Sequence, residues 1–519
     1  MSRAPTLGWF GVFRLALVQA SLGAVVVLTT STLNRVMVVE LALPAALPGV
    51  LVALHYFIQL SRPTFGHASD RGGRRTPWIV GGMAMLATGG LAAAGATALM
   101  GVSPGAGILG AMLAFLLIGA GVGACGTSLL VLLAASVEPE RRAPAATITW
   151  VMMIASFAVT ATVAGAFLDP FSFPRLLAVT GTVSALALTV TVVATWGIER
   201  RAPAPAVAAE DASNAAAVAS DSAPRAPVRD ERFLPALRRV LGESHTRAFA
   251  LFVFISMLAY SAQDLVLEPF AGAVFGLTPG ESTQLGGRQH GGVLLGMIGV
   301  AVVGRLAGSG GQGILRVCLV LGCVASAALI GALALSGLKG PPWPLETNVF
   351  LLGLANGAYA VAAIGSMMAM VSEGSEGHDG TRMGVWGAAQ AIAFGLGGMA
   401  GTGVVDLVRW ASESVATAYA VVFCAQGALF LVAGWLALRM PRARMAALGG
   451  KPAGAVRPEA VAAVGSGLDP QPSFTPGLEP SSNAGPKPSL KPSLNPSPKP
   501  VPNLIPGRAG VFAAAGRDH

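Results

Sequence analysis

Apolar stretches of membrane-spanning length recur along most of the chain and constrain its fold more than any other feature. About 20 apolar residues allow a helix to cross the hydrocarbon core of a bilayer, and in lipid such stretches form helices because every backbone polar group must be satisfied internally. The predicted spans cover roughly residues 13–38, 46–62, 77–99, 107–135, 144–168 and 175–197, followed after a gap by 248–273, 290–308, 314–337, 347–371, 382–405 and 416–439. The sequence therefore predicts an all-α polytopic membrane protein with about twelve transmembrane helices in two six-helix lobes.

Charged residues are scarce and lie mainly between the apolar stretches. Only 11% of the residues are charged, compared with about 25% in soluble globular proteins. The net charge of +9 comes from arginines in alternate loops, which orient membrane helices and do not indicate nucleic-acid binding. These are Arg71, Arg74, Arg75, Arg141, Arg142, Arg200, Arg201, Arg305, Arg316, Arg439, Arg442 and Arg444. The pattern predicts that both termini and the central loop are cytoplasmic.

Composition divides the chain into four segments. Residues 1–197 and 248–440 are the predicted N-terminal and C-terminal lobes. The linker 198–247 begins with Ala, Pro and Ser residues that cannot build a core. It ends in ERFLPALRRVLGESHTRAF, which is predicted to form a short amphipathic helix on the anionic cytoplasmic leaflet. Residues 441–519 are predicted to be a disordered, Pro-rich tail, which we expect to be solvated rather than to dock a partner.

The stretch Tyr260–Gly292 places polar and acidic residues at the outer end of an apolar run. Asp264 and Glu268, beside Gln263, are four residues apart and share one helix face. Ionisable groups at membrane depth normally face a bundle interior, a partner charge or a water-filled cavity. Alternatively, Pro269 and the following glycines end the helix, and both carboxylates are simply hydrated.

The first span has a comparable polar end, which contains Asn34, Arg35 and Glu40. An unpaired arginine near the bilayer is costly. We therefore expect Arg35 to pair with Asp264 or Glu268 across the axis that relates the two halves, closing the periplasmic side. The predicted cargo and charge-pair site consists of Asn34, Arg35, Gln263, Asp264 and Glu268.

The loop between the second and third predicted spans reads GHASDRGGRR. Its Gly66, Asp70, Arg71, Gly73, Arg74 and Arg75 resemble a cytoplasmic gate motif of the major facilitator superfamily. Glycines permit a tight turn, an aspartate can cap a neighbouring helix end, and arginines can meet phosphates or carboxylates. The alternative is that the arginines only orient the chain. The second half keeps Gly304 and Gly311 but has Gly308 in place of the aspartate, as expected of two related halves.

Two stretches carry a more specific resemblance. SAQDLVLEPFAGAVFGLTPGEST with the following QHGGVLLGM, and the run Phe13–Tyr56, resemble the PucC/LhaA family of purple phototrophic bacteria. The likeness covers about residues 8–440, except for much of the loop at 200–230. It implies a major facilitator-like protein of the bacterial inner or intracytoplasmic photosynthetic membrane. It also implies a role in bacteriochlorophyll delivery and light-harvesting complex assembly, with bacteriochlorophyll as cargo rather than an intrinsic cofactor. Antenna polypeptides, membrane lipids and the pigment synthase are the implied partners. GGRRTPW and LPAALPGVLVALHY favour PucC over LhaA.

A chlorin cargo would need an axial ligand for its magnesium. The resemblance makes His290 the preferred candidate, because it lies in the family-like stretch, with His55 as the second. Magnesium prefers oxygen donors, so a carbonyl or water is an alternative. A histidine near a span is more often a hydrogen-bonded packing residue. The amides Gln19, Gln59, Asn356 and Gln390 could contact cargo, although hydrogen bonds between helices are their usual role.

The sequence has no Walker loop, no paired-Asp helix of the prenyltransferase kind and no GxSxG motif, so an enzyme is not expected. One alternative function is a proton-coupled exporter of a lipophilic molecule, with Asp264 and Glu268 as proton carriers. Another is a non-transporting scaffold for antenna helices. The glycine-rich runs Leu116–Gly126 and Phe394–Gly403 predict close helix packing, or room for a flat macrocycle.

Overall fold

A computed structural model describes residues 7–61, 74–201, 244–306, 311–371 and 379–439, and these residues belong to one compact unit, Met1–Gly450. The apolar part of the predicted amphipathic helix, residues 231–243, and the predicted Pro-rich tail from residue 441 lie outside the described residues, while the end of the amphipathic stretch, from Ser244, belongs to the first helix of the second half. All regular elements of the described part are helices, as the apolar stretches predict.

The first half begins with one long membrane span, Trp9–Glu40. It consists of α1 (Trp9–Val27), α2 (Leu33–Arg35) and two π-helical turns, η1 (Leu28–Thr32) and η2 (Val36–Glu40). The remaining helices are α3 (Ala46–Gln59), α5 (Thr76–Met100), α6 (Pro104–Ser136), α7 (Pro139–Leu168), α8 (Phe173–Thr195) and the short α9 (Ile198–Arg201).

The second half repeats this arrangement of six long helices. They are α11 (Ser244–Phe275), α12 (Pro279–Leu306), α13 (Gly311–Lys339), α14 (Leu345–Val371), α15 (Asp379–Ser412) and α16 (Val415–Arg439). Within the described residues, 10 helices are long and apolar enough to cross a membrane, and α3 is a shorter apolar helix. With α12, which is more polar, they make the predicted twelve-helix arrangement.

The connection after Pro269 tests one alternative and one predicted boundary. The alternative that Pro269 ends the helix does not hold, because α11 continues to Phe275, close to the predicted end of the span near residue 273. The next helix begins at Pro279 rather than near residue 290, so the glycine-rich stretch is the first part of α12. Gly, Gln, Arg and His lower the hydropathy of this part, and hydropathy alone therefore misplaced its start.

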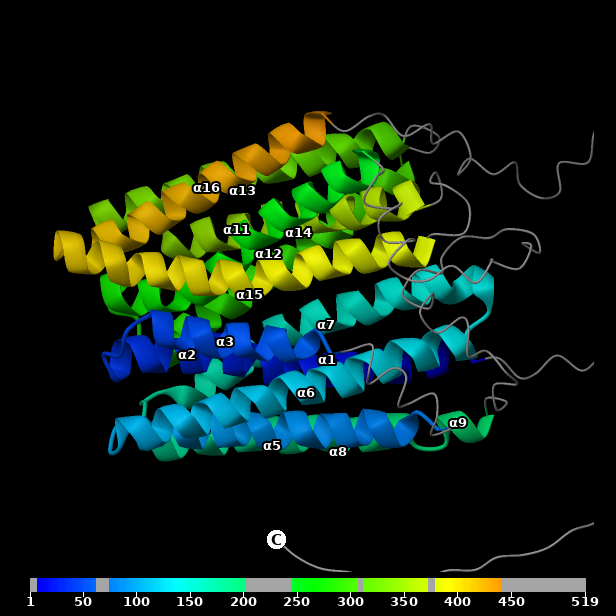
Figure 1. Cartoon of the computed structure of the whole chain (residues 1–519), viewed down its shortest axis with the longest axis horizontal. Coiled ribbons are helices and arrows are strands. Elements are labelled where there is room, and N and C mark those ends of the chain that lie inside the picture. Colours follow the sequence, from blue (N-terminus) through cyan, green and yellow to red (C-terminus); the bar gives the residue numbers. More distant parts are fainter. Residues whose placement is uncertain (1–6, 62–73, 202–243, 307–310, 372–378, 440–519) are drawn as a thin grey trace, which may run out of the picture. The chain divides into compact units, whose positions relative to one another are not determined.

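Each half packs mainly upon itself. In the N-terminal lobe α5 packs against α6 and α8, while α1 packs against α7 and α8. In the C-terminal lobe α11 packs against α15 and α16, α12 against α14, and α13 against α14 and α16. Figure 1 shows the first half in blue to teal and the second half in green to orange. The lobes meet where α7 packs against α12 and α3 packs against α15.

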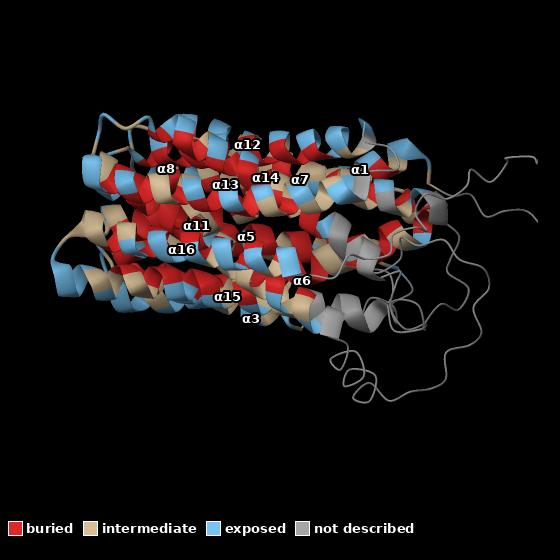
Figure 2. Cartoon of the chain, turned by 90° about the horizontal axis from the view of Figure 1, so that it is seen from above, coloured by how far each residue is buried: buried red, intermediate tan, exposed pale blue. Residues whose placement is uncertain are grey.

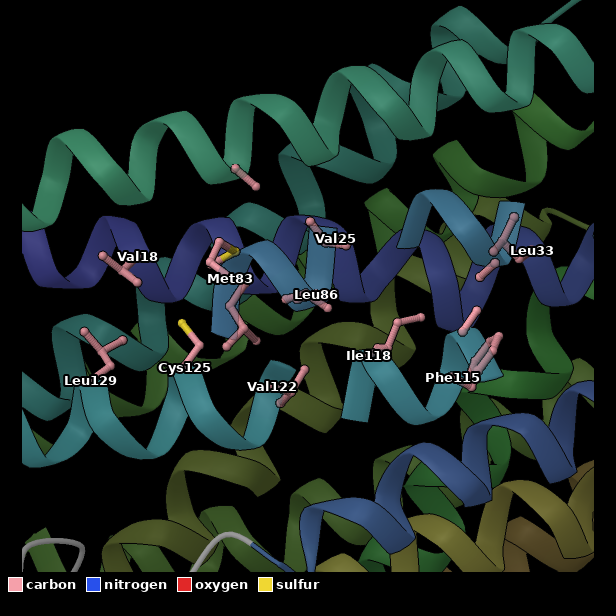
Figure 3. Close-up of a cluster of buried hydrophobic side chains, with 14 of the residues drawn as sticks. Val18, Val25, Leu33, Met83, Leu86, Phe115, Ile118, Val122, Cys125 and Leu129 are labelled. Atoms are coloured by element: carbon pink, nitrogen blue, oxygen red, sulfur yellow. The ribbon is translucent and has the colours of Figure 1, made fainter. Parts of the chain in front are cut away.

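The lobe cores are apolar and their outer surfaces are apolar as well. Buried residues face inward and exposed residues face outward along the helices (Figure 2). In the N-terminal core, Met83 of α5 and Ile118 and Cys125 of α6 pack with Val18 and Val25 of α1 (Figure 3). The exposed helix faces carry large apolar side chains such as Phe167, Leu321 and Leu438, as expected where lipid is the solvent.

Both glycine-rich runs serve helix packing, which confirms that part of the prediction. A Cβ at Gly121 of α6 would lie 2.6 Å from the backbone nitrogen of Leu86 in α5. A Cβ at Gly397 of α15 would lie 2.5 Å from the carbonyl oxygen of Leu258 in α11. Only glycine permits backbones to approach this closely.

Three connections that bear on the contact between the lobes gather at one end of the bundle. They are the connection between η2 and α3, the connection between α7 and α8, and the connection between α11 and α12. We call this end the Asp169 end, and Figure 1 shows it at left.

Candidate functional site between the lobes

The five predicted site residues lie on two elements that come together across the two halves. Asn34 and Arg35 belong to α2, and Gln263, Asp264 and Glu268 belong to α11, which contacts α2, η1 and η2. All are buried except Asp264, which is partly exposed. The alternative of simply hydrated carboxylates does not hold for Glu268, which is only 2% exposed.

Glu268 occupies the boundary between the lobes. Ser31 of η1 donates a hydrogen bond to its Oε1, and Oε2 is buried without a hydrogen-bond partner among the described residues. A Cβ at Gly286 of α12 would lie 2.7 Å from Oε1. The carboxyl group therefore lies between η1 of one lobe and α12 of the other, in space left by a glycine. Nearby, Thr32 Oγ1 is 3.2 Å from Thr283 Oγ1 of α12.

Arg35 has a different partner from the one predicted. Its Nη1 forms a salt bridge with Glu40 of the same span, and among the described residues neither Asp264 nor Glu268 forms a salt bridge. Its Nη2 donates a 2.6 Å hydrogen bond to the carbonyl oxygen of Leu277, in the connection between α11 and α12. A Cβ at Gly272 would lie 3.0 Å from Arg35 Nε. Arg35 thus links the lobes through a backbone carbonyl just beyond the end of α11. It does not pair with Asp264 or Glu268, because Glu40 of its own span is within reach of Nη1.

Asn34 also contacts the backbone of α11. Its Nδ2 donates a 2.5 Å hydrogen bond to the carbonyl oxygen of Leu265. In a regular helix this carbonyl would accept from the residue four positions later, which is Pro269 and has no N–H. Pro269 does not end the helix. Instead, it leaves the carbonyl oxygen of Leu265 free to accept the hydrogen bond from Asn34 of the opposite lobe.

Gln263 and Asp264 differ in their surroundings although they are adjacent in sequence. Gln263 Oε1 accepts from Asn356 Nδ2 at 3.1 Å, and Ser326 donates to Asn356 Oδ1 at 2.8 Å. This chain joins α11, α14 and α13 within the C-terminal lobe, so Gln263 and Asn356 act in helix packing. Asp264 Oδ1 is buried and has no hydrogen-bond partner among the described residues.

The predicted gate motif is only partly described. Gly66, Asp70, Arg71 and Gly73 lie outside the described residues. Arg74 Nε is 3.8 Å from Glu199 Oε2, and the same carboxylate accepts from the backbone nitrogens of Arg75 and, at 3.1 Å, Thr76. Glu199 of α9 therefore caps the N-terminus of α5. Of the matching loop, Gly304 lies in α12, Gly311 begins α13, and Gly308 is outside the described residues.

The two candidate histidines are buried on different helices. His290 Nδ1 is 2.8 Å from the carbonyl oxygen of Gly286, and Phe157 of α7 packs edge-on against its ring. His55 Nε2 is 2.7 Å from Gln59 Nε2. Both histidines have the hydrogen bonds typical of packing residues. In His290 the bonded nitrogen is Nδ1, which donates its proton to the carbonyl, so the lone pair of Nε2 can bind a metal ion. No group of three or more His, Cys, Asp or Glu that could hold a metal ion occurs among the described residues.

Sequence reasoning missed Ser31, Asp169 and Asp406, which join the lobes through hydrogen bonds. A signal for the surroundings of Asp169 was present in the sequence Thr278-Pro279-Gly280-Glu281. Threonine followed three residues later by glutamate is a capping box, and proline favours the first helical position. The box forms, with Thr278 N donating to Glu281 Oε2 at 2.9 Å and Glu281 N donating to Thr278 Oγ1 at 3.2 Å.

In the part of the chain that the structure describes, twelve helices in two similar lobes with a polar boundary between them define a membrane protein of the major facilitator fold. Solved transporters share it. A bacterial homologue of the human lysosomal transporter Spinster, inward-facing and unoccupied, has a TM-score of 0.60 at 15% identity, covering 83% of this chain and 97% of that chain. A point mutant of the nucleoside transporter NupG has a TM-score of 0.59 at 15% identity, covering 83% and 99%. At this identity the likeness concerns the fold alone.

The chain belongs to the PUCC protein family, and the model of that family matches residues 32–445. It is 51% identical over 445 residues to the "Bacteriochlorophyll synthase 44.5 kDa chain" of Rhodobacter capsulatus, covering 85% of this chain and 98% of that relative. It is 28% identical over 439 residues to "Protein PucC" of the same organism, covering 81% and 90%. The family predicted from the stretches around Asp264 and Phe13 is confirmed.

Proposed function

We propose that this protein holds bacteriochlorophyll in the membrane and passes it to light-harvesting antenna polypeptides during their assembly. The observation that carries the proposal is the likeness over 98% of a relative named for bacteriochlorophyll synthase, combined with a transporter fold. The membrane is the bacterial inner or intracytoplasmic membrane. Both termini are cytoplasmic, which puts the Asp169 end on the periplasmic side. Membrane lipids and the pigment synthase are further partners.

Pigment binding rather than synthesis is the activity we assign. The relative's name includes a synthase, but a prenyl-transfer enzyme would need Asp-rich sites for magnesium diphosphate, and this sequence has none. His290 would supply the axial ligand to the pigment magnesium through Nε2, because its Nδ1 is bound to the carbonyl of Gly286. The boundary between α7 and α12, where His290 meets Phe157, is where the ring would contact the protein.

The test is the absorption spectrum of protein purified gently from pigmented membranes. Delivery predicts a near-infrared band that co-elutes with the protein in a fixed ratio. A control purification of an unrelated major facilitator protein from the same membranes measures adventitious pigment. Protein that elutes with no more pigment than this control, while antenna polypeptides co-purify, would favour the scaffold function instead.

A second candidate, a proton-coupled exporter of a lipophilic molecule, is favoured by the position of Glu268. An acid buried between two lobes is placed where gaining or losing a proton would alter the contact between them. Uptake into inverted vesicles that depends on a proton gradient, and that is lost in Glu268→Gln or Asp264→Asn, would support this function. Uptake that does not depend on the proton gradient, or that is unchanged in both variants, would exclude the exporter function.

A further inference from the structure

The N-terminus of α3 is capped by an aspartate from the other lobe. Asp406 of α15 accepts two backbone hydrogen bonds, from Ala45 N to Oδ1 at 2.9 Å and from Ala46 N to Oδ2 at 2.7 Å. The first amides of a helix have no partner within the helix, and a carboxylate also matches the positive end of the helix dipole. The start of α3 therefore depends on a residue about 360 positions away in the sequence.

The N-terminus of α12 is held in the same way from the opposite direction. Asp169, which directly follows α7, accepts a 2.5 Å hydrogen bond from Thr278 Oγ1 to Oδ2. Its Oδ1 accepts from the backbone nitrogen of Gly280 at 3.2 Å. Thr278 and Glu281 already cap this helix locally. The contact with Asp169 thus adds an attachment to the other lobe.

The two contacts are equivalent within the repeated fold. The helices α3 and α12 are each the second of their half, and α7 and α15 are each the fifth. An acid on or just after the fifth helix of one half therefore caps the second helix of the other, once in each direction. Both contacts lie at the Asp169 end, because they are made to the residues at the starts of α3 and α12.

Glycines bring the helix backbones close enough for so short a side chain to reach. A Cβ at Gly280 of α12 would lie 2.5 Å from the carbonyl oxygen of Gly165 in α7. A Cβ at Gly49 of α3 would lie 3.2 Å from the Cα of Met399 in α15. A short side chain cannot follow a separation of these helices by several ångströms, since hydrogen bonds require donor–acceptor distances of about 3 Å.

We propose that Asp169 and Asp406 form a reciprocal latch that keeps the Asp169 end closed and that must release before the lobes can part there. Arg35 reinforces the latch, because its positive charge lies near the negative end of the α11 dipole and it donates a hydrogen bond to the carbonyl of Leu277 just beyond that helix. The latch follows from hydrogen bonds and topology and does not depend on which cargo the protein carries.

Thiol accessibility tests the latch directly. Thr283, on the second turn of α12, is 1% exposed, so Thr283→Cys is protected while this end is closed. The background carries Cys318→Ala and Cys424→Ala, and keeps Cys125 and Cys323, which are fully buried within the lobes. Full-length protein in lipid nanodiscs is treated with a water-soluble maleimide. We expect Asp169→Ala and Asp406→Ala each to raise the labelling rate of the introduced thiol by roughly 5- to 30-fold, the range that loss of one helix cap supports.

Further variants separate the latch from general destabilisation. Asp169→Asn and Asp406→Asn keep an oxygen acceptor and are expected to give smaller increases. Glu413→Ala removes an exposed acid that directly follows α15 and is expected to leave labelling unchanged. Equal labelling of the parent and both folded Ala variants overturns the proposal. If the Ala variants do not accumulate, equal labelling of the parent and both Asn variants overturns it as well.

Discussion

Asn34 donates a hydrogen bond to the carbonyl oxygen of Leu265, which Pro269 leaves without a helical partner. A proline that appears to be a helix terminator is instead paired with an amide on the opposite lobe. The pair shows how a membrane helix can contain proline when a neighbouring helix satisfies the freed carbonyl.

Asn34→Ala should lower the free energy of unfolding by about 1–2 kcal/mol, because it leaves the Leu265 carbonyl buried and unpaired. Pro269→Ala restores an N–H to α11, so the same substitution should cost less in a Pro269→Ala background. Thermal unfolding of the four proteins in one detergent gives the coupling energy. Additive effects would show that Pro269 and Asn34 act independently.

Gly286→Ala should displace the Glu268 carboxylate, because the added Cβ would collide with Oε1. We expect the free energy of unfolding to fall by about 1–3 kcal/mol, the cost of disturbing a buried hydrogen-bonded acid. Gly291→Ala, a helical glycine of α12 with nothing within 4 Å of the added Cβ, is the matched control. It should be neutral or stabilising by up to about 1 kcal/mol, since alanine favours helices. Similar unfolding temperatures for the two variants would contradict the assigned position of Glu268.

His290→Ala should weaken pigment binding roughly tenfold, which corresponds to about 1.4 kcal/mol of binding free energy, if its Nε2 binds the magnesium. The pigment occupancy should fall accordingly. His55→Ala removes a buried histidine from α3 and should change occupancy much less. The ratio of near-infrared absorbance to protein is the measurement. Equal ratios in both variants would mean that an oxygen donor or water holds the magnesium.

Glu199→Ala should cost about 1 kcal/mol of stability, because its carboxylate caps the first amides of α5. Arg74→Ala should cost much less, since the arginine side chain is 66% exposed and its salt bridge is long. Differential scanning fluorimetry distinguishes the two. A larger effect for Arg74 would indicate that the gate motif holds it in place by contacts beyond Glu199.

Hydropathy and charge predicted the fold well because the bilayer allows few alternatives. The predicted span 77–99 and the observed α5, Thr76–Met100, nearly coincide. The start of α12 was misplaced because glycine and polar residues hide a helix from hydropathy, although its capping box was readable.

Arg35 and Glu268 lie between the lobes, but their contacts differ from the predicted ones. Burial of Arg35 and Glu268 followed from their depth in apolar runs. Their partners did not, because Arg35 bonds a backbone carbonyl and Glu268 bonds a serine hydroxyl, and neither group stands out in a sequence. Asp169 and Asp406 escaped notice because each acts on a helix start that is distant along the chain.

The dependence of α3 on Asp406 has a consequence for biogenesis. During synthesis the second helix of the chain enters the membrane long before the eleventh long helix exists, and its first amides must meanwhile bond to water or lipid headgroups. That helix start is completed only when α15 has been inserted. The nascent first half is therefore an unfinished intermediate whose maturation is set by the arrival of the second.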